Sequence, residues 1–127
     1  MPENKSYLNL NKITPYKLAY NLSSYVWGLI IKWDYFNQRT VGIQLVRAMD
    51  SISANIAEGF GRYHKKDKIN FYHYSLASTY EALDWLLKAK TRKLLNQKQY
   101  DLIFNQLINL PKEINSLIYF TQQKLKH

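Results

Sequence analysis

The chain has 127 residues and 15.1 kDa, a size typical of one domain, which we expect to span residues 1–127. It contains no cysteine, which excludes disulfides, zinc–thiolate sites, iron–sulfur clusters and thiol nucleophiles. Its 18 Lys and Arg residues against 9 Asp and Glu residues give a formal net charge of +9, which favours an anionic partner such as nucleic acid or an acidic membrane surface.

The composition leaves a second explanation of this charge open. The chain is rich in Lys, Asn, Ile and Tyr, which A/T-rich genomes over-produce, yet Glu, which such codons also permit, occurs only four times. Contact with nucleic acid and a basicity set by genome composition therefore both remain open.

The sequence contains no segment typical of export or of membrane insertion. The first residues, MPENKSYLNLNK, contain no apolar core, so we expect no signal peptide. The longest apolar run, VWGLII (26–31), is far shorter than the roughly 20 residues of a membrane span. We therefore expect a cytoplasmic protein, which the lack of cysteine also suits.

Long apolar patterns at helical spacing, with only 4 Gly and 3 Pro in the chain, predict an all-α protein. No run shows the alternation of a β-strand. We expect helices at about residues 15–33, 38–60, 67–93 and 96–125. Short connections between such helices imply an antiparallel up-down-up-down four-helix bundle.

Local signals mark the ends of these helices. Thr14 followed by Pro15 predicts an N-cap and a first helical position, and KWDYFNQ (32–38) is typical of a turn. Asp67 is the predicted N-cap of the third helix. Pro111 lies inside the fourth, where it removes a backbone hydrogen bond, so we expect a kink or a split near it.

Apolar residues spaced by three and four positions form the predicted core stripes. The second helix contributes Val41, Leu45, Met49, Ile52 and Ile56, and the third contributes Ile69, Tyr72, Leu76, Tyr80, Leu83 and Leu87. Core packing is the preferred interpretation of these stripes.

A second, polar line runs along the second helix, nearly opposite its apolar stripe. Its members recur at steps of four, four, three and four residues: Arg47, Ser51, Asn55, Glu58 and Arg62. Glu58 and Arg62 form an i,i+4 pair in the favourable order. Small residues such as Ser53, Ala54 and Ala57 separate the two lines.

Two interpretations of the polar line are open. It is either a plain solvent face, or a face covered by another helix or by another copy of the chain. Between Thr40 and Gly61 only Arg47, Asp50 and Glu58 are charged, which is few for a solvent face and favours cover. We predict a paired polar seam or subunit interface with these members: Arg47, Ser51, Asn55, Glu58, and from the third helix Ser78 and Glu81.

The stretch RAMDSISANIAEGFGR (47–62), followed on the next helix by Ser78-X-X-Glu81, resembles the four-helix-bundle proteins encoded within 23S ribosomal RNA intervening sequences. The resemblance extends from about residue 16 to 124. The central motif is carried by Arg47, Ala48, Ser51, Ile52, Asn55, Ile56, Ala57, Glu58, Gly59 and Arg62. The family usually has a glycine before the serine of the third helix, where this chain has Ala77.

The resemblance implies a non-enzymatic four-helix bundle, often assembled as a ring-shaped homopentamer. A related branch contains accessory proteins of diversity-generating retroelements, which bind a reverse transcriptase and nucleic acid. The biochemical function of the intervening-sequence branch is largely unassigned, and its name records where the genes lie.

Gly59-Phe60-Gly61 is a poor phosphate loop. Dinucleotide loops follow a strand and open a helix, whereas this segment follows a helix, and the Walker pattern is absent. Glycine as the left-handed residue that stops a helix is the better interpretation.

Basic residues concentrate after this stop. Residues 62–93 hold eight basic side chains against Asp67, Glu81 and Asp84. In an antiparallel bundle the basic residues divide between the two ends of the third helix, roughly 33 Å apart at 1.5 Å per residue. The predicted nucleic-acid-binding residues are Arg62, Lys65, Lys66 and Lys68 at one end, and Lys88, Lys90, Arg92 and Lys93 at the other. Tyr63, Tyr72 and Tyr74 near the first group either stack on unpaired bases or serve only in packing.

No catalytic, cofactor or metal pattern emerges. The histidines, His64, His73 and His127, lack metal-ligand spacing, so we expect no metal and no cofactor. Our first hypothesis is a non-enzymatic, homo-oligomeric binding or scaffold protein that holds RNA, such as ribosomal RNA, through phosphate contacts. A protein–protein adaptor, such as a partner of a reverse transcriptase, is the second, and an enzyme of unknown type is the third.

Overall fold

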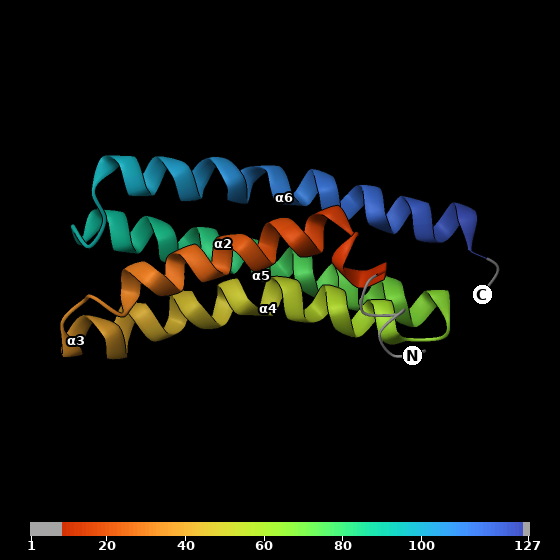
Figure 1. Cartoon of the computed structure of the whole chain (residues 1–127), viewed down its shortest axis with the longest axis horizontal. Coiled ribbons are helices and arrows are strands. Elements are labelled where there is room, and N and C mark those ends of the chain that lie inside the picture. Colours follow the sequence, from red (N-terminus) through yellow and green to blue (C-terminus); the bar gives the residue numbers. More distant parts are fainter. Residues whose placement is uncertain (1–8, 126–127) are drawn as a thin grey trace.

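The computed structural model describes residues 9–125, and its regular structure there is entirely helical (Figure 1). The elements are α2 (Thr14–Ile30), α3 (Tyr35–Asn37), the π-helical segment η1 (Gln38–Gly42), α4 (Ile43–Gly61), α5 (Lys65–Thr91) and α6 (Gln97–Lys124). The all-α class predicted from the sequence is confirmed. Most of the first segment, for which we expect no signal peptide, lies outside the described residues, as does His127.

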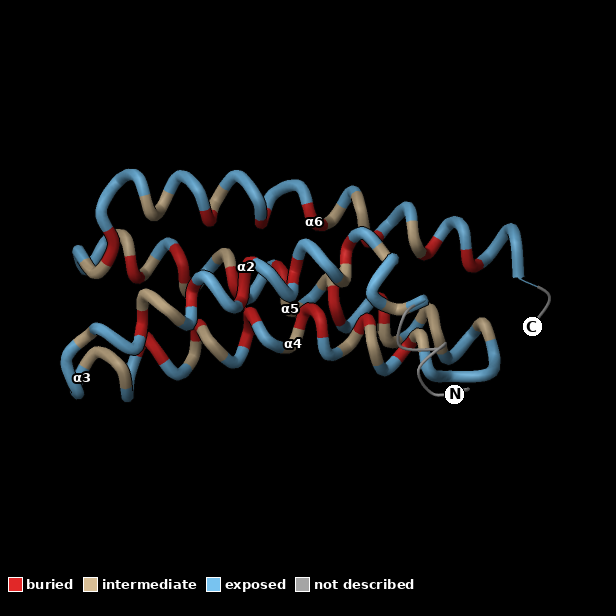
Figure 2. Tube along the Cα trace, in the orientation of Figure 1, coloured by how far each residue is buried: buried red, intermediate tan, exposed pale blue. Residues whose placement is uncertain are grey.

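The long helices α2, α4, α5 and α6 lie side by side, and the chain reverses direction between each and the next (Figure 1). α4 packs against α2 and α5, and α6 packs against α5 and α2. α3 and η1 connect α2 to α4 at one end of the molecule, and residues 62–64 connect α4 to α5 at the other. The buried residues lie on the sides of the long helices that face one another (Figure 2).

The core side of α4 follows the predicted stripe. Leu45, Met49, Ile52 and Ile56 are at most 1% exposed, and Val41 is also buried. α6 adds buried apolar residues at the same helical spacing: Ile103, Leu107, Leu110, Ile114 and Ile118.

The core side of α5 differs from the predicted stripe. Two members of that stripe, Tyr80 and Leu87, are 62% and 49% exposed, so their assignment to the core is wrong. The buried side consists of Tyr72, Ser75, Thr79, Ala82, Leu86 and Ala89. Four of these are small or polar, and their hydroxyls are satisfied by backbone acceptors: Ser75 Oγ donates to Ile52 O of α4 at 2.8 Å, and Thr79 Oγ1 donates to Ser75 O at 2.9 Å.

Three predicted boundaries also change. Ile13, not Thr14, is the N-cap of α2. Pro15 is therefore the second residue of the helix and not the first. His64, not Asp67, is the N-cap of α5, and Asp67 lies in the first turn, where a carboxylate still suits the helix dipole. The predicted turn contains the short α3, because the Asp34 carboxylate accepts a hydrogen bond from Asn37 N at 3.0 Å.

The start and interior of α6 agree better with the sequence. Asn96 is the N-cap and forms a capping box with Gln99. α6 continues through Pro111 as one helix, so the helix is not split there. The kink stays a prediction.

The Gly59-Phe60-Gly61 segment does not stop α4 in the expected way. All three residues are helical, and Arg62, with φ −77° and ψ 150°, ends the helix in an extended conformation. Among the described glycines none has a positive φ. Gly59 instead permits close packing, because a Cβ placed there would lie 2.7 Å from Tyr72 Cε1 and 2.9 Å from the backbone oxygen of Lys68.

Candidate functional site

The first group of predicted cations, Arg62, Lys65, Lys66 and Lys68, lies at the turn between α4 and α5, and we call it the turn patch. Three of its members contact the protein itself. Arg62 Nη2 and Nε lie 3.0 and 3.1 Å from Glu58 Oε2, as the i,i+4 spacing predicted. Lys65 Nζ donates to Gln122 O at 3.0 Å, and Lys68 Nζ donates to Phe60 O at 2.7 Å. Lys66 is exposed and makes no such bond within residues 9–125.

The second group, Lys88, Lys90, Arg92 and Lys93, lies where α5 ends, and we call it the end patch. Lys88 pairs with Asp84 and lies over the Trp85 ring. Lys90 Nζ lies 4.3 Å from the centroid of the Tyr100 ring. Arg92 and Lys93 are exposed in the loop that follows, with no hydrogen bond or ion pair from their side chains to the described part of the chain. These two cations are therefore open to a phosphate.

The structure does not bring the two patches together within one chain. α5 is 27 residues long, so its ends lie about 40 Å apart at 1.5 Å per residue. It does add cations to the end patch that the sequence prediction missed. Lys32, Arg39 and Lys98 belong to segments that meet at this same end, because α2 ends there, α3 and η1 lie there and α6 begins there (Figure 1).

The tyrosines near the turn patch have different environments. Tyr63 is 68% exposed and Tyr74 is 55% exposed, so both rings are accessible to an unpaired base. Tyr72 is only 2% exposed, so of the two interpretations left open for this ring, packing holds. Burial also raises the pKa of the Tyr72 hydroxyl to about 12.

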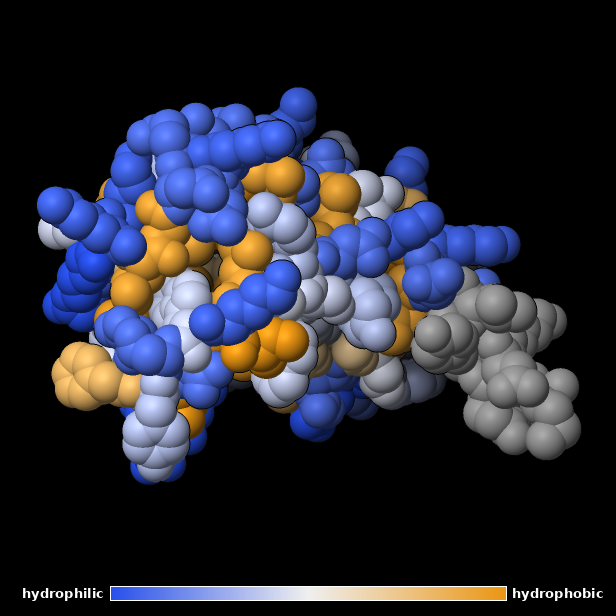
Figure 3. Space-filling model, turned by 60° about the vertical axis from the view of Figure 1, so that its left-hand side comes forward, coloured by the Kyte–Doolittle hydropathy of each residue, from blue (hydrophilic) through white to orange (hydrophobic). Residues whose placement is uncertain are grey.

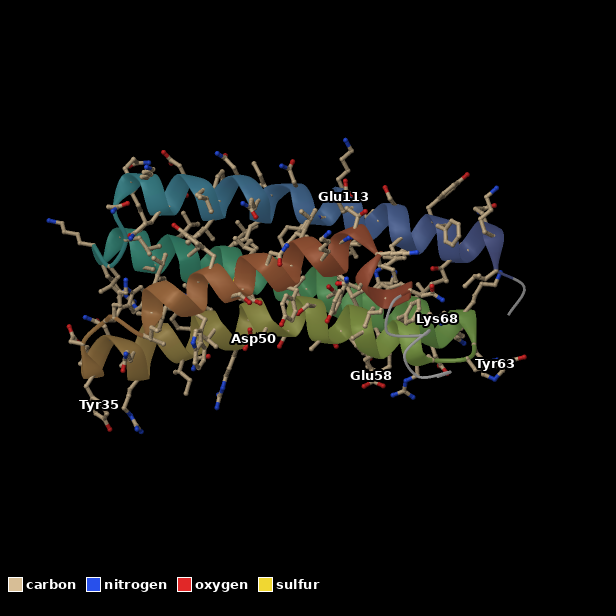
Figure 4. The ribbon with its side chains drawn as sticks, viewed as in Figure 1. Tyr35, Asp50, Glu58, Tyr63, Lys68 and Glu113 are labelled. Carbon is tan, nitrogen blue, oxygen red and sulfur yellow. The ribbon has the colours of Figure 1, made fainter. Side chains whose placement is uncertain are left out.

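The predicted polar seam lies on the surface of the single chain. Arg47, Glu58 and Glu81 are exposed, and Ser51, Asn55 and Ser78 are half-buried. Asn55 Nδ2 donates to Ser51 O at 2.9 Å within α4, and Glu58 points away from the body of the molecule (Figure 4). Within the described residues this line is therefore only partly covered.

Asn55 and Ser78 share one outer face of the α4–α5 pair. The Arg62 guanidinium, at the end of α4, lies over the ring of Phe71 of α5, 4.6 Å from its centroid. This contact shows which outer side of α4 adjoins which outer side of α5. At 100° per residue, Asn55 lies on the same side of α4 as Arg62, and Ser78 on the same side of α5 as Phe71. Glu81 lies further round α5. The structure therefore collects most of the motif on one face without bonding its two halves.

The remaining candidates for chemistry give no constellation. Within residues 9–125 no three His, Asp or Glu side chains gather into a group that could hold a metal ion. His64 caps α5, and His73 is exposed on it. None of the described helices combines the length and the apolar character that crossing a membrane requires.

Comparison with known proteins identifies the chain. Residues 11–116 match the family described as 23S rRNA-intervening sequence protein. No curated protein matches the sequence significantly. A crystal structure of a protein of unknown function from the S23 ribosomal protein family of Bacteroides thetaiotaomicron is similar in fold, with a TM-score of 0.73 and 22% identity over 82% of this chain and 97% of the other. Since the family match spans most of the sequence, the chain belongs to the 23S rRNA-intervening sequence protein family.

Proposed function

We propose that the protein is a non-enzymatic, homo-oligomeric scaffold that binds RNA through phosphate contacts, and that its long helices act as one antiparallel four-helix bundle. The net charge of +9 and the open cations Arg92 and Lys93 of the end patch carry the proposal. Phosphate binding by Lys and Arg does not depend on the sequence of the RNA, and its affinity falls steeply as the salt concentration rises. The name of the family, and that of the S23 ribosomal family to which the similar crystal structure belongs, make ribosomal RNA the first ligand to test.

The end patch gives the sharpest test of RNA binding. Replacing Arg92 and Lys93 together by Gln is expected to weaken RNA binding at every sequence tested. The slope of log affinity against log salt should fall in magnitude by about 1.4, since each lost contact to a single strand is worth about 0.7. Filter binding over a salt series measures both.

The matched control replaces Lys17 and Lys112, which are exposed elsewhere, by Gln. It changes the net charge equally and should leave the slope nearly unchanged. Equal effects of the two double variants would mean that only total charge matters, and absence of salt-sensitive binding at low ionic strength would contradict the proposal.

Assembly is the second part of the proposal. We propose that the polar seam pairs with another copy of the chain in a closed ring, for which five subunits is the expected number. Its support is that the whole stretch from Thr40 to Gly61 holds only three charged residues, and that small residues flank the polar line. Rings would repeat each basic patch once per subunit, so that weak phosphate contacts add by avidity.

Asn55→Leu is expected to shift the protein towards smaller species in sedimentation velocity and to lower the free energy of assembly by about 1–3 kcal/mol, because a paired seam would lose its hydrogen bonds. Asn105→Leu, the same change at an exposed position of α6, is the control. An unchanged mass for Asn55→Leu would mean that the seam is a plain solvent face.

An adaptor role is the second candidate, favoured by the apolar surface at the α3 end of the molecule. Tyr35 and Phe36 are 71% and 72% exposed. A nearby groove of about 370 Å³ is lined by Trp27, Ile31, Ile43, Arg39 and Arg47, among others. Figure 3 turns this end forward and shows hydrophobic surface open between hydrophilic side chains. Such a groove suits an apolar protein segment with acidic flanks, such as one of a reverse transcriptase, and a partner that survives nuclease treatment would favour this role.

A further inference from the structure

A cavity opens at the end of the molecule where α4 ends and α5 begins. It holds about 490 Å³, within the range of small-molecule sites. Figure 4 shows Lys68 and Tyr63 at this end. Most of its described lining is apolar, from segments far apart in the chain: Ile13, Phe60, Leu117, Phe120 and Leu125.

Tyr72 brings an unpartnered hydroxyl to this apolar lining. The residue is only 2% exposed, yet its hydroxyl makes no hydrogen bond within the described chain. No buried side-chain oxygen or nitrogen among those residues is both sealed from solvent and without a partner, so the hydroxyl must reach the open space of the cavity. A tyrosine hydroxyl keeps its proton at neutral pH, so the group is available as a donor.

Lys68 supplies a positive charge one turn away on the same face of α5. Its ammonium donates one bond, to Phe60 O, and retains two further N–H groups. Burial lowers the pKa of Lys68, because its ammonium is only partly solvated there. A bound anion would stabilise the charged form in place of the missing water. The guanidinium of Arg62 at the rim is engaged by Glu58, and no carboxylate of the described residues lines the cavity.

We propose that this cavity binds a small amphipathic carboxylate, with its apolar chain between Ile13, the end of α4 and α6, and its head group held by the Tyr72 hydroxyl and the Lys68 ammonium. Two donors without a competing acid select an anion, and the apolar lining selects a hydrocarbon body. Gly59 supports the site, because its missing Cβ leaves room for the Tyr72 ring against α4. Lys68 also belongs to the turn patch, but the test of RNA binding uses Arg92 and Lys93 at the other end of α5, so either proposal can fail alone.

Octanoate is a suitable probe, and octylamine is its counterpart of opposite charge and equal chain length. In two-dimensional amide NMR of the full chain, octanoate should shift the signals of Gly59, Lys68 to Tyr72 and Leu117 to Thr121. We expect octanoate to bind about tenfold more tightly than octylamine, or more, because the carboxylate accepts hydrogen bonds from both donors, whereas the octylammonium ion has no acceptor and is repelled by the Lys68 ammonium. Equal affinities, or shifts that map to the Trp27 groove instead, would overturn the proposal.

Two variants separate the donors. Tyr72→Phe removes only the unpartnered hydroxyl, so it should leave the thermal transition unchanged and weaken octanoate by roughly twofold to tenfold. Tyr74→Phe, at an exposed position of the same helix, is the control and should bind like the unaltered protein. Lys68→Met should abolish the preference for octanoate over octylamine; if that variant does not fold, Tyr72→Phe decides. Unchanged octanoate affinity in Tyr72→Phe would overturn the assignment.

Discussion

Leu86→Ala is expected to lower the free energy of unfolding by about 2–5 kcal/mol, whereas Leu87→Ala, the same change one residue later, should cost less than about 1 kcal/mol. Leu86 is fully buried and Leu87 is 49% exposed. Truncation at Leu86 removes packed methyl groups and leaves a cavity between helices, while truncation at Leu87 removes surface that water already reaches. Urea denaturation followed by circular dichroism measures both.

The adjacent pair makes the comparison strict, because helix propensity and chemical change are the same at both positions. Equal losses would contradict the assignment of the buried face of α5. A loss at Leu87 that shrinks on dilution would instead identify Leu87 as a contact between subunits. Running both variants at two protein concentrations distinguishes these outcomes.

The leucine pair also marks where sequence reasoning was sufficient for the fold and where it was not. α4 buries the large aliphatic side chains that its spacing picks out, such as Leu45 and Ile52, so its core side could be predicted. α5 buries Ser75, Thr79 and Ala82 against the body of the molecule. Small residues carry little hydrophobic signal, and hydroxyls are satisfied only by partners such as Ile52 O that a sequence does not place. The larger apolar side chains of α5, such as Leu87, flank its buried face, and the predicted stripe follows those larger side chains instead.

The candidate site divides in a similar way. The cations of the two patches and the Glu58–Arg62 pair follow from composition and i,i+4 spacing, and the structure places the pair as expected. The cavity could not be predicted, because its lining comes from residues as distant as Ile13 and Leu125. The only local signals were Gly59 and Tyr72, and each has an ordinary role in packing. That the Tyr72 hydroxyl lacks a partner within residues 9–125 is visible only once the side chains of those residues have been placed.

Gly59→Ala is expected to destabilise the protein by up to about 2 kcal/mol, although alanine forms helices better than glycine. Overpacking costs about 1–3 kcal/mol, and the helix preference of alanine returns about 1 kcal/mol. The new Cβ would lie 2.7 Å from Tyr72 Cε1 and 2.9 Å from Lys68 O. The ring is held inside the core and the oxygen belongs to the backbone, so neither can move without shifting α5.

Gly61→Ala is the matched control, since Gly61 is also helical and a Cβ there meets nothing within 4 Å. That variant should gain about 0.4–1 kcal/mol, because alanine lowers the entropy of the unfolded chain. Opposite signs for the two variants, measured by urea denaturation, are the expected result. Stabilisation by both would mean that Gly59 does not limit the approach of α5 to α4. Because Tyr72 and Lys68 are the groups that Gly59→Ala displaces, the same variant should also weaken octanoate binding, whereas Gly61→Ala should leave it unchanged.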